Sequence, residues 1–158
     1  MSLEANKALA RRIWDDVFND RNLASAEELV APDAVNYEAP PGIDSRGPQS
    51  LRAIVTWLTS VVPDHHTAID QVIAEGDLVV LQTTFSGTQQ GAMMGVAPTG
   101  RRFAQRQVHI VRIRDGKAVE HWAIRDDLGM LQQLGALPTP VAHDAAGAGV
   151  SSTPERRT

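Results

Sequence analysis

The 158-residue sequence contains no cysteine, and aromatic residues make up only 4% of it. The absence of cysteine excludes a disulfide framework, a thiolate nucleophile and any Cys-ligated zinc or iron–sulfur site. No uninterrupted apolar run approaches the ~20 residues that a membrane-spanning helix needs, so we expect no membrane association. The first residues, MSLEANKALARR, resemble the start of a helix rather than the apolar stretch of a secretory signal. We therefore expect a cytoplasmic protein.

An excess of basic residues is also missing. Fifteen Lys and Arg residues stand against nineteen Asp and Glu residues, which gives a formal net charge of -4. The densest basic clusters are Arg101, Arg102 and Arg106, and the pair Arg112 and Arg114. Nucleic-acid binding normally relies on a basic face that displaces counterions from phosphates. The charge balance therefore predicts no nucleic-acid partner.

Helical periodicity is present in the first third of the chain. Apolar residues spaced by three and four positions predict helices at residues 3–19 and 48–62. Ser25 and Glu28 have the spacing of a capping box, which predicts a short helix at Ala26–Val30 between them. A short strand is expected at Ala34–Glu38, before a Pro- and Gly-rich loop.

The pattern changes to strand periodicity after Asp64. Four strands are predicted, at residues 67–74, 78–86, 102–114 and 117–125. The Asp115-Gly116 dipeptide is a strong hairpin signal between the last two. A short helix should run from Asp126 or Asp127 to Leu134.

This order predicts the α+β class, with three N-terminal helices packed on one face of a curved antiparallel sheet. Helices that cover the concave side only in part leave room for a small-molecule pocket. We expect a single domain over residues 1–137. Residues 138–158 are rich in Pro, Gly, Ser and Ala and predict a disordered tail.

One face of the third predicted strand carries an unusual mixture of side chains. Strand alternation places aromatic, amide, imidazole and aliphatic groups together on it. These residues are Phe103, Gln105, Gln107, His109, Val111 and Ile113. An imidazole titrates near neutral pH, so His109 suits proton transfer in a polar-lined pocket. The alternative is a hydrogen-bonded histidine of the core.

Three motifs resemble the SnoaL-like polyketide cyclase family, which has the cone-shaped fold of nuclear transport factor 2. They are G-x-x-P-T-G at residues 95–100, D-G-K-x-x-E-H-W at residues 115–122 and Q-L-G at residues 133–135. The resemblance covers residues 5–137 and implies an intramolecular aldol reaction on a polyketide, without a cofactor. It also implies a catalytic histidine, present as His109, and an aspartate directly after the His-Trp pair. That position holds Ala123, which cannot transfer a proton.

The missing carboxylate directs attention to two other acids. Glu38 precedes a Pro-rich loop by the expected pocket mouth, where partial burial favours a general base; the alternative is a solvated loop carboxylate. Asp126 is a second catalytic candidate, although alternation places it on the opposite face unless a bulge intervenes. Capping of the last helix explains Asp126 equally well.

Other residues are predicted to bind the substrate. They are Tyr37, Met93, Met94, Gln105, Gln107, His121, Ala123 and Arg125. Arg125 would hold an enolate or ester oxygen, or else form a salt bridge. The two methionines lie in a loop with flanking glycines and suit a flexible lid. No metal site is expected, because His65 and His66 point to opposite faces of a strand.

The sequence thus predicts a cofactor-independent acid–base enzyme that closes or isomerises a ring of an aromatic polyketide. A hydroxylation component and a non-catalytic binding or dimerisation module remain alternatives, because the fold hosts several functions. Val108, Ile110, Trp122 and Ile124 fall on the face away from the pocket. This apolar surface predicts a homodimer or homotetramer.

Overall fold

A computed structural model describes residues 2–138 of the chain. The elements in chain order are α1 (Leu3–Arg12), a π-helix (Ile13–Asn19), α2 (Ser25–Leu29), β1 (Val30–Asn36), α3 (Gly47–Val61), β2 (His66–Glu75), β3 (Leu78–Thr88), β4 (Arg102–Arg114), β5 (Lys117–Arg125) and α4 (Asp127–Gln133). Within the described part, no helix is both long and apolar enough to cross a membrane. The predicted tail lies outside the described residues from position 139 onward.

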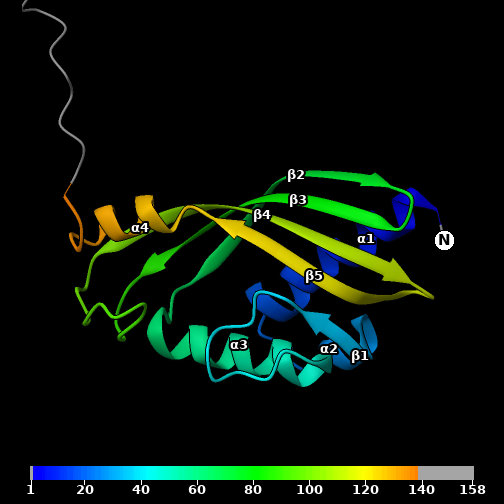
Figure 1. Cartoon of the computed structure of the whole chain (residues 1–158), viewed down its shortest axis with the longest axis horizontal. Helices are drawn as coiled ribbons and strands as arrows, with labels where there is room; N and C mark the ends of the chain where they lie inside the picture. The colour runs from blue at the N-terminus through cyan, green and yellow to red at the C-terminus, as the bar shows by residue number, and fades with distance from the viewer. Residues whose placement is uncertain (1, 139–158) are drawn as a thin grey trace, which may run out of the picture.

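The strands form one five-stranded sheet in the order β1-β5-β4-β3-β2. It curves over α3, with α1 on the same concave side and the edge strand β1 beside α3 (Figure 1). This confirms the α+β class. The pairs β2–β3, β3–β4 and β4–β5 are antiparallel as predicted, but β1 pairs with β5 in parallel. β1 and β5 are joined by most of the domain rather than by a tight turn, so the connection leaves their relative direction free.

The first predicted helix changes its winding halfway. Ala10, Ile13, Trp14 and Val17 are buried, as their spacing predicted, but the α-helix ends at Arg12. A π-helix continues to Asn19, with Trp14 stacked on Phe18 at 5.9 Å. A wider π turn shifts side chains around the axis, and such turns are frequent at functional sites.

The predicted capping box is wrong. Ser25 lies inside α2, and Ala24 occupies the cap position without a side-chain hydrogen bond. The Glu28 carboxylate instead accepts hydrogen bonds from the Arg12 guanidinium at 2.8 and 3.2 Å. Because α2 ends at Leu29, β1 begins at Val30, four residues before the predicted strand.

The apolar core consists of two clusters. The larger joins α1 and the π-helix to the sheet through Trp14, Val17, Leu81 and Val111, among others. The smaller lies toward the other end of α3 and is made by Val61, Val62, Phe85, Met93, Phe103, Met130 and Leu134. The space between the two clusters is the site described below.

The outer face of the sheet is exposed in the single chain. Ile124 is 77% exposed and Val108 is 38% exposed. Tyr37 stacks on Trp122 with ring centroids 5.2 Å apart. The homodimer or homotetramer that this face predicts stays a prediction.

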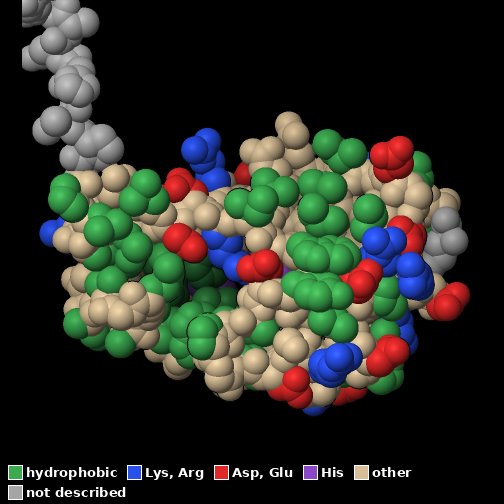
Figure 2. All heavy atoms as spheres, in the orientation of Figure 1, with side chains coloured by type: hydrophobic (Ala, Val, Ile, Leu, Met, Phe, Trp, Pro, Cys, Tyr) green, Lys and Arg blue, Asp and Glu red, His purple; other side chains and the backbone are tan. Residues whose placement is uncertain are grey.

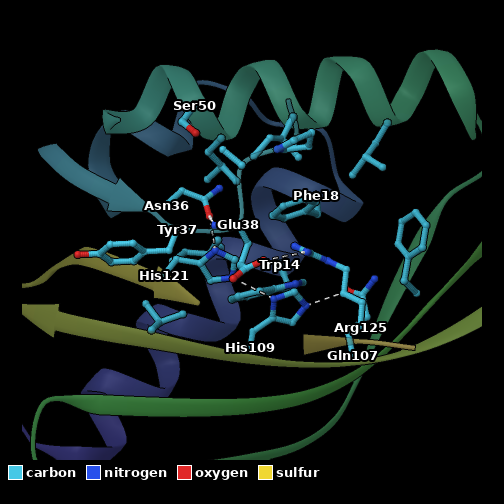
Figure 3. A pocket seen from close by; sticks show the side chains of 18 of the residues that line it. Trp14, Phe18, Asn36, Tyr37, Glu38, Ser50, Gln107, His109, His121 and Arg125 are labelled. Carbon is cyan, nitrogen blue, oxygen red and sulfur yellow. Dashed lines mark hydrogen bonds and ion pairs between the residues drawn. The ribbon is translucent and has the colours of Figure 1, made fainter. Parts of the chain in front are cut away.

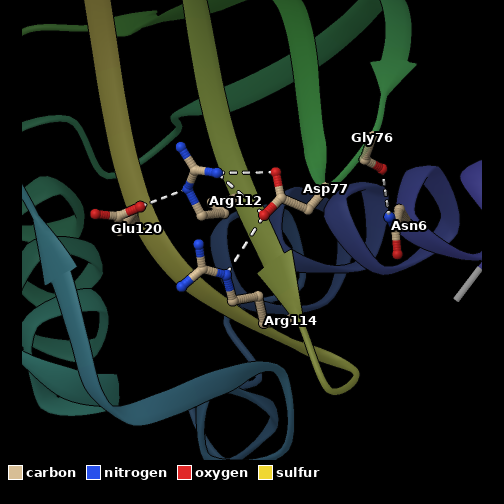
Figure 4. Close-up of polar contacts among 6 residues, drawn as sticks. All are labelled: Asn6, Gly76, Asp77, Arg112, Arg114 and Glu120. Atoms are coloured by element: carbon tan, nitrogen blue, oxygen red, sulfur yellow. Dashed lines mark hydrogen bonds and ion pairs between the residues drawn. The ribbon is translucent and has the colours of Figure 1, made fainter.

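One of the two basic clusters is neutralised by acids (Figure 4). Arg112 Nη1 donates to both carboxylate oxygens of Asp77 at 2.9 and 3.0 Å. Arg112 Nε donates to Glu120, and Arg114 Nε lies 3.4 Å from Asp77. These ion pairs join the start of β3 to β4 and β5. Both guanidinium groups are therefore already paired with carboxylates, which would repel a phosphate at the same place.

His65 is a buried histidine that the mechanism below does not use. Thr59 Oγ1 donates to the carbonyl of Val55, so its contact with His65 Nε2 at 3.3 Å assigns the proton to Nε2. His65 Nδ1 is buried with no hydrogen-bond partner among the described residues. Burial lowers the pKa of His65 to about 4, with Arg21 adding to the effect.

This pKa predicts a loss of stability in acid. The folded state holds His65 neutral, whereas an unfolded imidazole takes up a proton below about pH 6.5. His65 therefore favours the fold fully above about pH 6.5, and this contribution is lost as the pH falls toward 4. We expect the unfolding free energy of the wild type to fall more steeply across this window than that of His65→Gln. The excess slope should correspond to at most about one proton taken up on unfolding. Urea titrations of both proteins at several pH values measure it, and parallel slopes would contradict the assignment.

Candidate active site

A cavity of about 410 Å³ opens between α3 and the concave side of the sheet. It reaches from Trp14 in the larger core cluster to Met130 in the smaller one. Figure 2 shows the hollow, with acidic and basic side chains at its rim and histidine visible inside. Much of the lining is apolar, from α3, the π-helix and the Pro40-Pro41 loop. Such a cavity suits a largely apolar ligand of drug-like size.

The sheet wall of the cavity carries a continuous row of polar groups. Gln105 Nε2 donates to Asp127 Oδ1 at 2.7 Å, and Gln107 Nε2 donates to Gln105 Oε1 at 2.7 Å. Gln107 Oε1 then lies 2.8 Å from His109 Nε2. The inward face predicted for β4 is confirmed, because Gln105, Gln107 and His109 are all buried and line the cavity.

The row continues from β4 to β5 and β1 (Figure 3). His109 Nδ1 lies 3.0 Å from His121 Nε2, and the two rings stack with centroids 5.2 Å apart. His121 Nδ1 lies 2.8 Å from Asn36 Oδ1. The same oxygen of Asn36 accepts a hydrogen bond from the backbone N–H of Glu38 at 3.0 Å. Six side chains from four elements thus form one hydrogen-bonded chain.

Burial governs the electrostatics of the two histidines. It lowers the pKa of His109, which is 4% exposed, well below the usual value, and the neighbouring His121 and Arg125 add to this. It lowers the pKa of His121 to about 4, with Arg125 contributing. The Trp14 ring lies 4.7 Å from the His109 ring, tilted by 54°. Trp14 therefore fixes the position of His109 from the helical side.

Arg125 and Glu38 bring opposite charges to the cavity. Arg125 Nη1 lies 3.9 Å from Glu38 Oε2, with both side chains about one-third exposed. Burial lowers the pKa of Arg125, while Glu38 and Asp127 oppose the shift. The guanidinium stays charged near neutral pH, because a free arginine titrates far above it. A substrate oxygen can therefore compete with Glu38 for this cation.

Asp126 does not reach the cavity. Its carboxylate caps α4 by accepting a hydrogen bond from the backbone N–H of Gly129 at 2.9 Å. The acid of this segment that lines the cavity is Asp127, one residue later. The chain leaves β5 after Arg125, so strand alternation no longer decides where these two side chains point.

Ala123 and Tyr37 have peripheral positions. Ala123 pairs with His109 in the β4–β5 register, which puts it on the pocket face, but its short side chain is not part of the cavity lining. Tyr37 lines the mouth, and its hydroxyl donates to Glu120 Oε1 at 3.3 Å.

The loop with the two methionines is tied down rather than free. Buried Gln89 accepts hydrogen bonds from the backbone N–H and the hydroxyl of Thr99, at 3.1 and 2.6 Å. Its amide nitrogen Nε2 lies within 3.2 Å of the backbone carbonyl oxygens of residues 91, 96 and 97 and donates hydrogen bonds to them. Met93 is 8% exposed and packs in the smaller core cluster, whereas Met94 is 52% exposed. These contacts argue against a flexible lid at Met93 and leave Met94 at the mouth.

Four polar residues of this region were not among the predicted site residues: Asn36, Ser50, Gln89 and Asp127. Asn36 and Asp127 terminate the hydrogen-bonded chain, and Ser50 lines the cavity with a buried hydroxyl that has no partner among the described residues. A sequence signal exists for two of them, because Asn36 lies near Glu38 and Asp127 directly follows Asp126. Among residues 2–138, no group of three or more His, Asp or Glu side chains is arranged to hold a metal ion.

Comparison with known protein families gives a match over most of the chain. The family model described as SnoaL-like polyketide cyclase matches residues 8–134. Over 115 residues, the chain is 37% identical to the aklanonic acid methyl ester cyclase DnrD of Streptomyces peucetius, covering 72% of this chain and 77% of that protein. It is 31% identical over 119 residues to the nogalonic acid methyl ester cyclase of Streptomyces nogalater, covering 75% of this chain and 89% of that protein.

Solved structures show the same similarity. TsrD from Streptomyces laurentii superposes with a TM-score of 0.78 at 30% identity, covering 87% of this chain and 99% of that chain. AclR of Streptomyces galilaeus, a proposed hydroxylase, superposes with a TM-score of 0.74 at 29% identity, covering 89% of this chain and 91% of that chain.

Proposed function

The chain belongs to the SnoaL-like polyketide cyclase family, and we propose that it closes a ring of an aromatic polyketide methyl ester by an intramolecular aldol reaction. The family membership confirms the resemblance in the sequence motifs. The substrate class rests on the aklanonic and nogalonic acid methyl esters named for the relatives.

The observation that carries the proposal is the polar row along one wall of an otherwise largely apolar cavity. A flat aromatic substrate gains from the apolar walls. The imidazoles and the Arg125 guanidinium meet its carbonyl groups on the sheet side. General acid–base groups and a fixed positive charge are what an enolate mechanism requires.

The chemistry is a net transfer of one proton from carbon to oxygen. A base removes a proton from the carbon next to a carbonyl, and the enolate carbon attacks a ketone carbon of the same molecule. A carbon–carbon bond forms, the ketone π electrons move to oxygen, and that oxygen takes up a proton. We assign proton transfer to His109 with Glu38 as its partner carboxylate, and oxyanion binding to Arg125. No electrons are gained or lost, so the reaction itself requires no redox cofactor.

A role in hydroxylation is the second candidate. The similarity to AclR and the alanine at position 123 favour it. This reaction takes one oxygen atom from dioxygen and needs two electrons from an added reductant, so it changes the product mass in a way that ring closure does not.

The test uses the purified protein with a panel of aromatic polyketide methyl esters in D2O, followed by mass spectrometry and chromatography. We expect a product of unchanged composition with a new ring, and deuterium uptake next to the reacting carbonyl. In a parallel reaction with dioxygen and an added reductant, a product heavier by one oxygen would support hydroxylation. Binding without exchange or closure would support a non-catalytic module.

Replacing Arg125 tests the oxyanion role. Arg125→Gln keeps hydrogen-bond donors but removes the positive charge that faces the cavity. We expect kcat for ring closure to fall about 10²–10³-fold, the effect of losing one oxyanion donor. The matched control is Arg106→Gln, which removes an exposed arginine of β4. Steady-state kinetics measure both variants, and equal small losses would remove Arg125 from the mechanism.

A further inference from the structure

The direction of each hydrogen bond in the polar row is fixed from its two ends. At one end, the Asp127 carboxylate can only accept, so the amide of Gln105 donates to it. Gln105 Oε1 then accepts from Gln107 Nε2, which leaves Gln107 Oε1 facing His109 Nε2 at 2.8 Å. A carbonyl oxygen only accepts, so His109 Nε2 must carry a proton.

The other end imposes the same requirement on His121. Asn36 Oδ1 accepts a hydrogen bond from the backbone N–H of Glu38, which establishes that this atom is oxygen and not the amide nitrogen. The same oxygen lies 2.8 Å from His121 Nδ1. His121 Nδ1 must therefore carry a proton as well.

These two assignments leave the contact between the rings without a proton if both histidines are neutral. Each neutral imidazole carries one proton, and both protons are already placed at the outer nitrogens. His109 Nδ1 and His121 Nε2 would then face each other at 3.0 Å with a lone pair on each. The contact becomes a hydrogen bond only when the pair carries a third proton and one positive charge.

We propose that His109 and His121 share one proton between His109 Nδ1 and His121 Nε2, and that this proton is the acid that protonates the new hydroxyl oxygen in ring closure. The catalytic part rests on the proposed function, whereas the shared proton is a property of the resting protein. The pair thereby takes over the acid role that the alanine at position 123 cannot perform.

The charges around the pair favour one added proton. The titratable groups that line the cavity are Tyr37 and Glu38 after β1, Glu120 and Arg125 on β5, and Asp127 at the start of α4. Glu120 is paired with Arg112 outside the cavity. Among these described residues, Glu38 and Asp127 outweigh Arg125 by one negative charge, which the shared proton balances. The π-helix contributes the Trp14 ring, whose centroid lies 4.7 Å from that of the His109 ring, within the distance at which an aromatic ring attracts a cation.

Burial and Arg125 act against the proton, since they lower the pKa of both imidazoles. The hydrogen-bond directions act for it, because loss of the proton leaves a buried lone-pair contact with no donor. A buried polar contact without a donor is costly, and coupled imidazoles titrate as a unit.

The shared proton also fits the balance of the reaction. Glu38 removes the proton from carbon, the carbon–carbon bond forms, and the ketone oxygen approaches the two facing nitrogens. It takes the proton from one ring as the ring-to-ring hydrogen bond breaks. The proton on Glu38 then returns to the pair, so that the enzyme ends as it began.

The experiment is nitrogen NMR of the 15N-histidine-labelled full chain at neutral pH, without substrate. We expect three protonated nitrogens on the two rings, one of them with a proton coupled to both facing nitrogens. The variants His121→Gln and His66→Gln assign the signals, because His66 is exposed and outside the cavity. Two protonated nitrogens in total, one per ring, would overturn the proposal.

The Asn36→Leu variant provides the second test. Without the acceptor at position 36, His121 is free to move its proton to Nε2 and donate to His109 while both rings stay neutral. We expect the pKa for uptake of the third proton to fall by at least about one unit, a tenfold loss of proton affinity. The high-pH limb of kcat for ring closure should shift by the same amount. A limb that stays in place while the NMR titration moves would refute the acid role.

The two proposals fail in different ways. Three protonated nitrogens without ring closure on any ester would reject the proposed function and keep the shared proton. Ring closure with only two protonated nitrogens on the two rings would reject the shared proton and keep the proposed function.

Discussion

The His109→Gln variant is expected to lose about 10²–10⁴ of kcat for ring closure, the usual contribution of a general acid–base group. Glutamine suits the test because it reproduces the contacts without the titration. Its amide nitrogen can donate to Gln107 Oε1, and its oxygen can accept from His121 Nε2 when the His121 ring carries the added proton. The polar row is thereby kept while His121 is protonated, and the proton can no longer pass to a ring at position 109.

His66→Gln is the matched control, since it makes the same exchange at an exposed histidine of β2. The measurements are initial rates on the ester substrate and quenching of tryptophan fluorescence on ligand binding. Trp14 lies against His109 and reports directly on the cavity. We expect the affinity of His109→Gln for the ligand to stay within a few-fold of the wild type. A rate within threefold of the wild type would assign the chemistry to another group.

The largest effect on stability is expected for Trp14→Ala, which should lower the unfolding free energy by about 3–5 kcal/mol. Trp14 is 3% exposed and belongs to the larger core cluster. It stacks on Phe18 within the π-helix and packs against His109 across the cavity wall. Its removal leaves a void that apolar neighbours cannot fill without moving the helix. Since domains of this kind have about 5–15 kcal/mol in total, the loss is a large part of it.

Trp57→Ala is the comparison, because Trp57 is only partly buried and lines the cavity from α3. We expect less than half the loss there, since water already reaches part of the ring. Urea unfolding followed by circular dichroism measures both variants, with equal slopes as the check that the unfolded states are comparable. Equal losses of unfolding free energy at the two positions would show that Trp14 of the π-helix contributes no more to the core than the partly buried Trp57.

Local patterns in the sequence were sufficient for much of the sheet. The predicted bounds of β4 and β5 agree with the structure, because the Asp115-Gly116 turn fixes where the hairpin reverses. Both residues have positive φ, at 49° and 74°, which this tight turn requires and which glycine adopts without strain. Alternation with period two then placed Gln105, Gln107 and His109 on the concave face.

Prediction failed where a side chain's position depends on distant residues. The parallel edge pairing of β1 with β5 was missed because no turn links them. The acid that lines the cavity is Asp127 and not the predicted Asp126, because the chain turns into α4 at that point. The two acids are adjacent in sequence, and only the exit of the strand decides which one faces the cavity.

The sequence by itself determined the α+β class, the family and the face of the sheet on which His109 lies. These follow from periodicity, turn residues and motifs, which are properties of neighbouring positions. Only the tertiary structure decided that His121 stacks on His109 and that Asn36 and Asp127 end the polar row. Asn36 and His121 are 85 positions apart, and their contact exists because β1 docks beside β5. The direction of each hydrogen bond in the row, and so the protonation that we propose for the pair, follows from groups that only folding brings together.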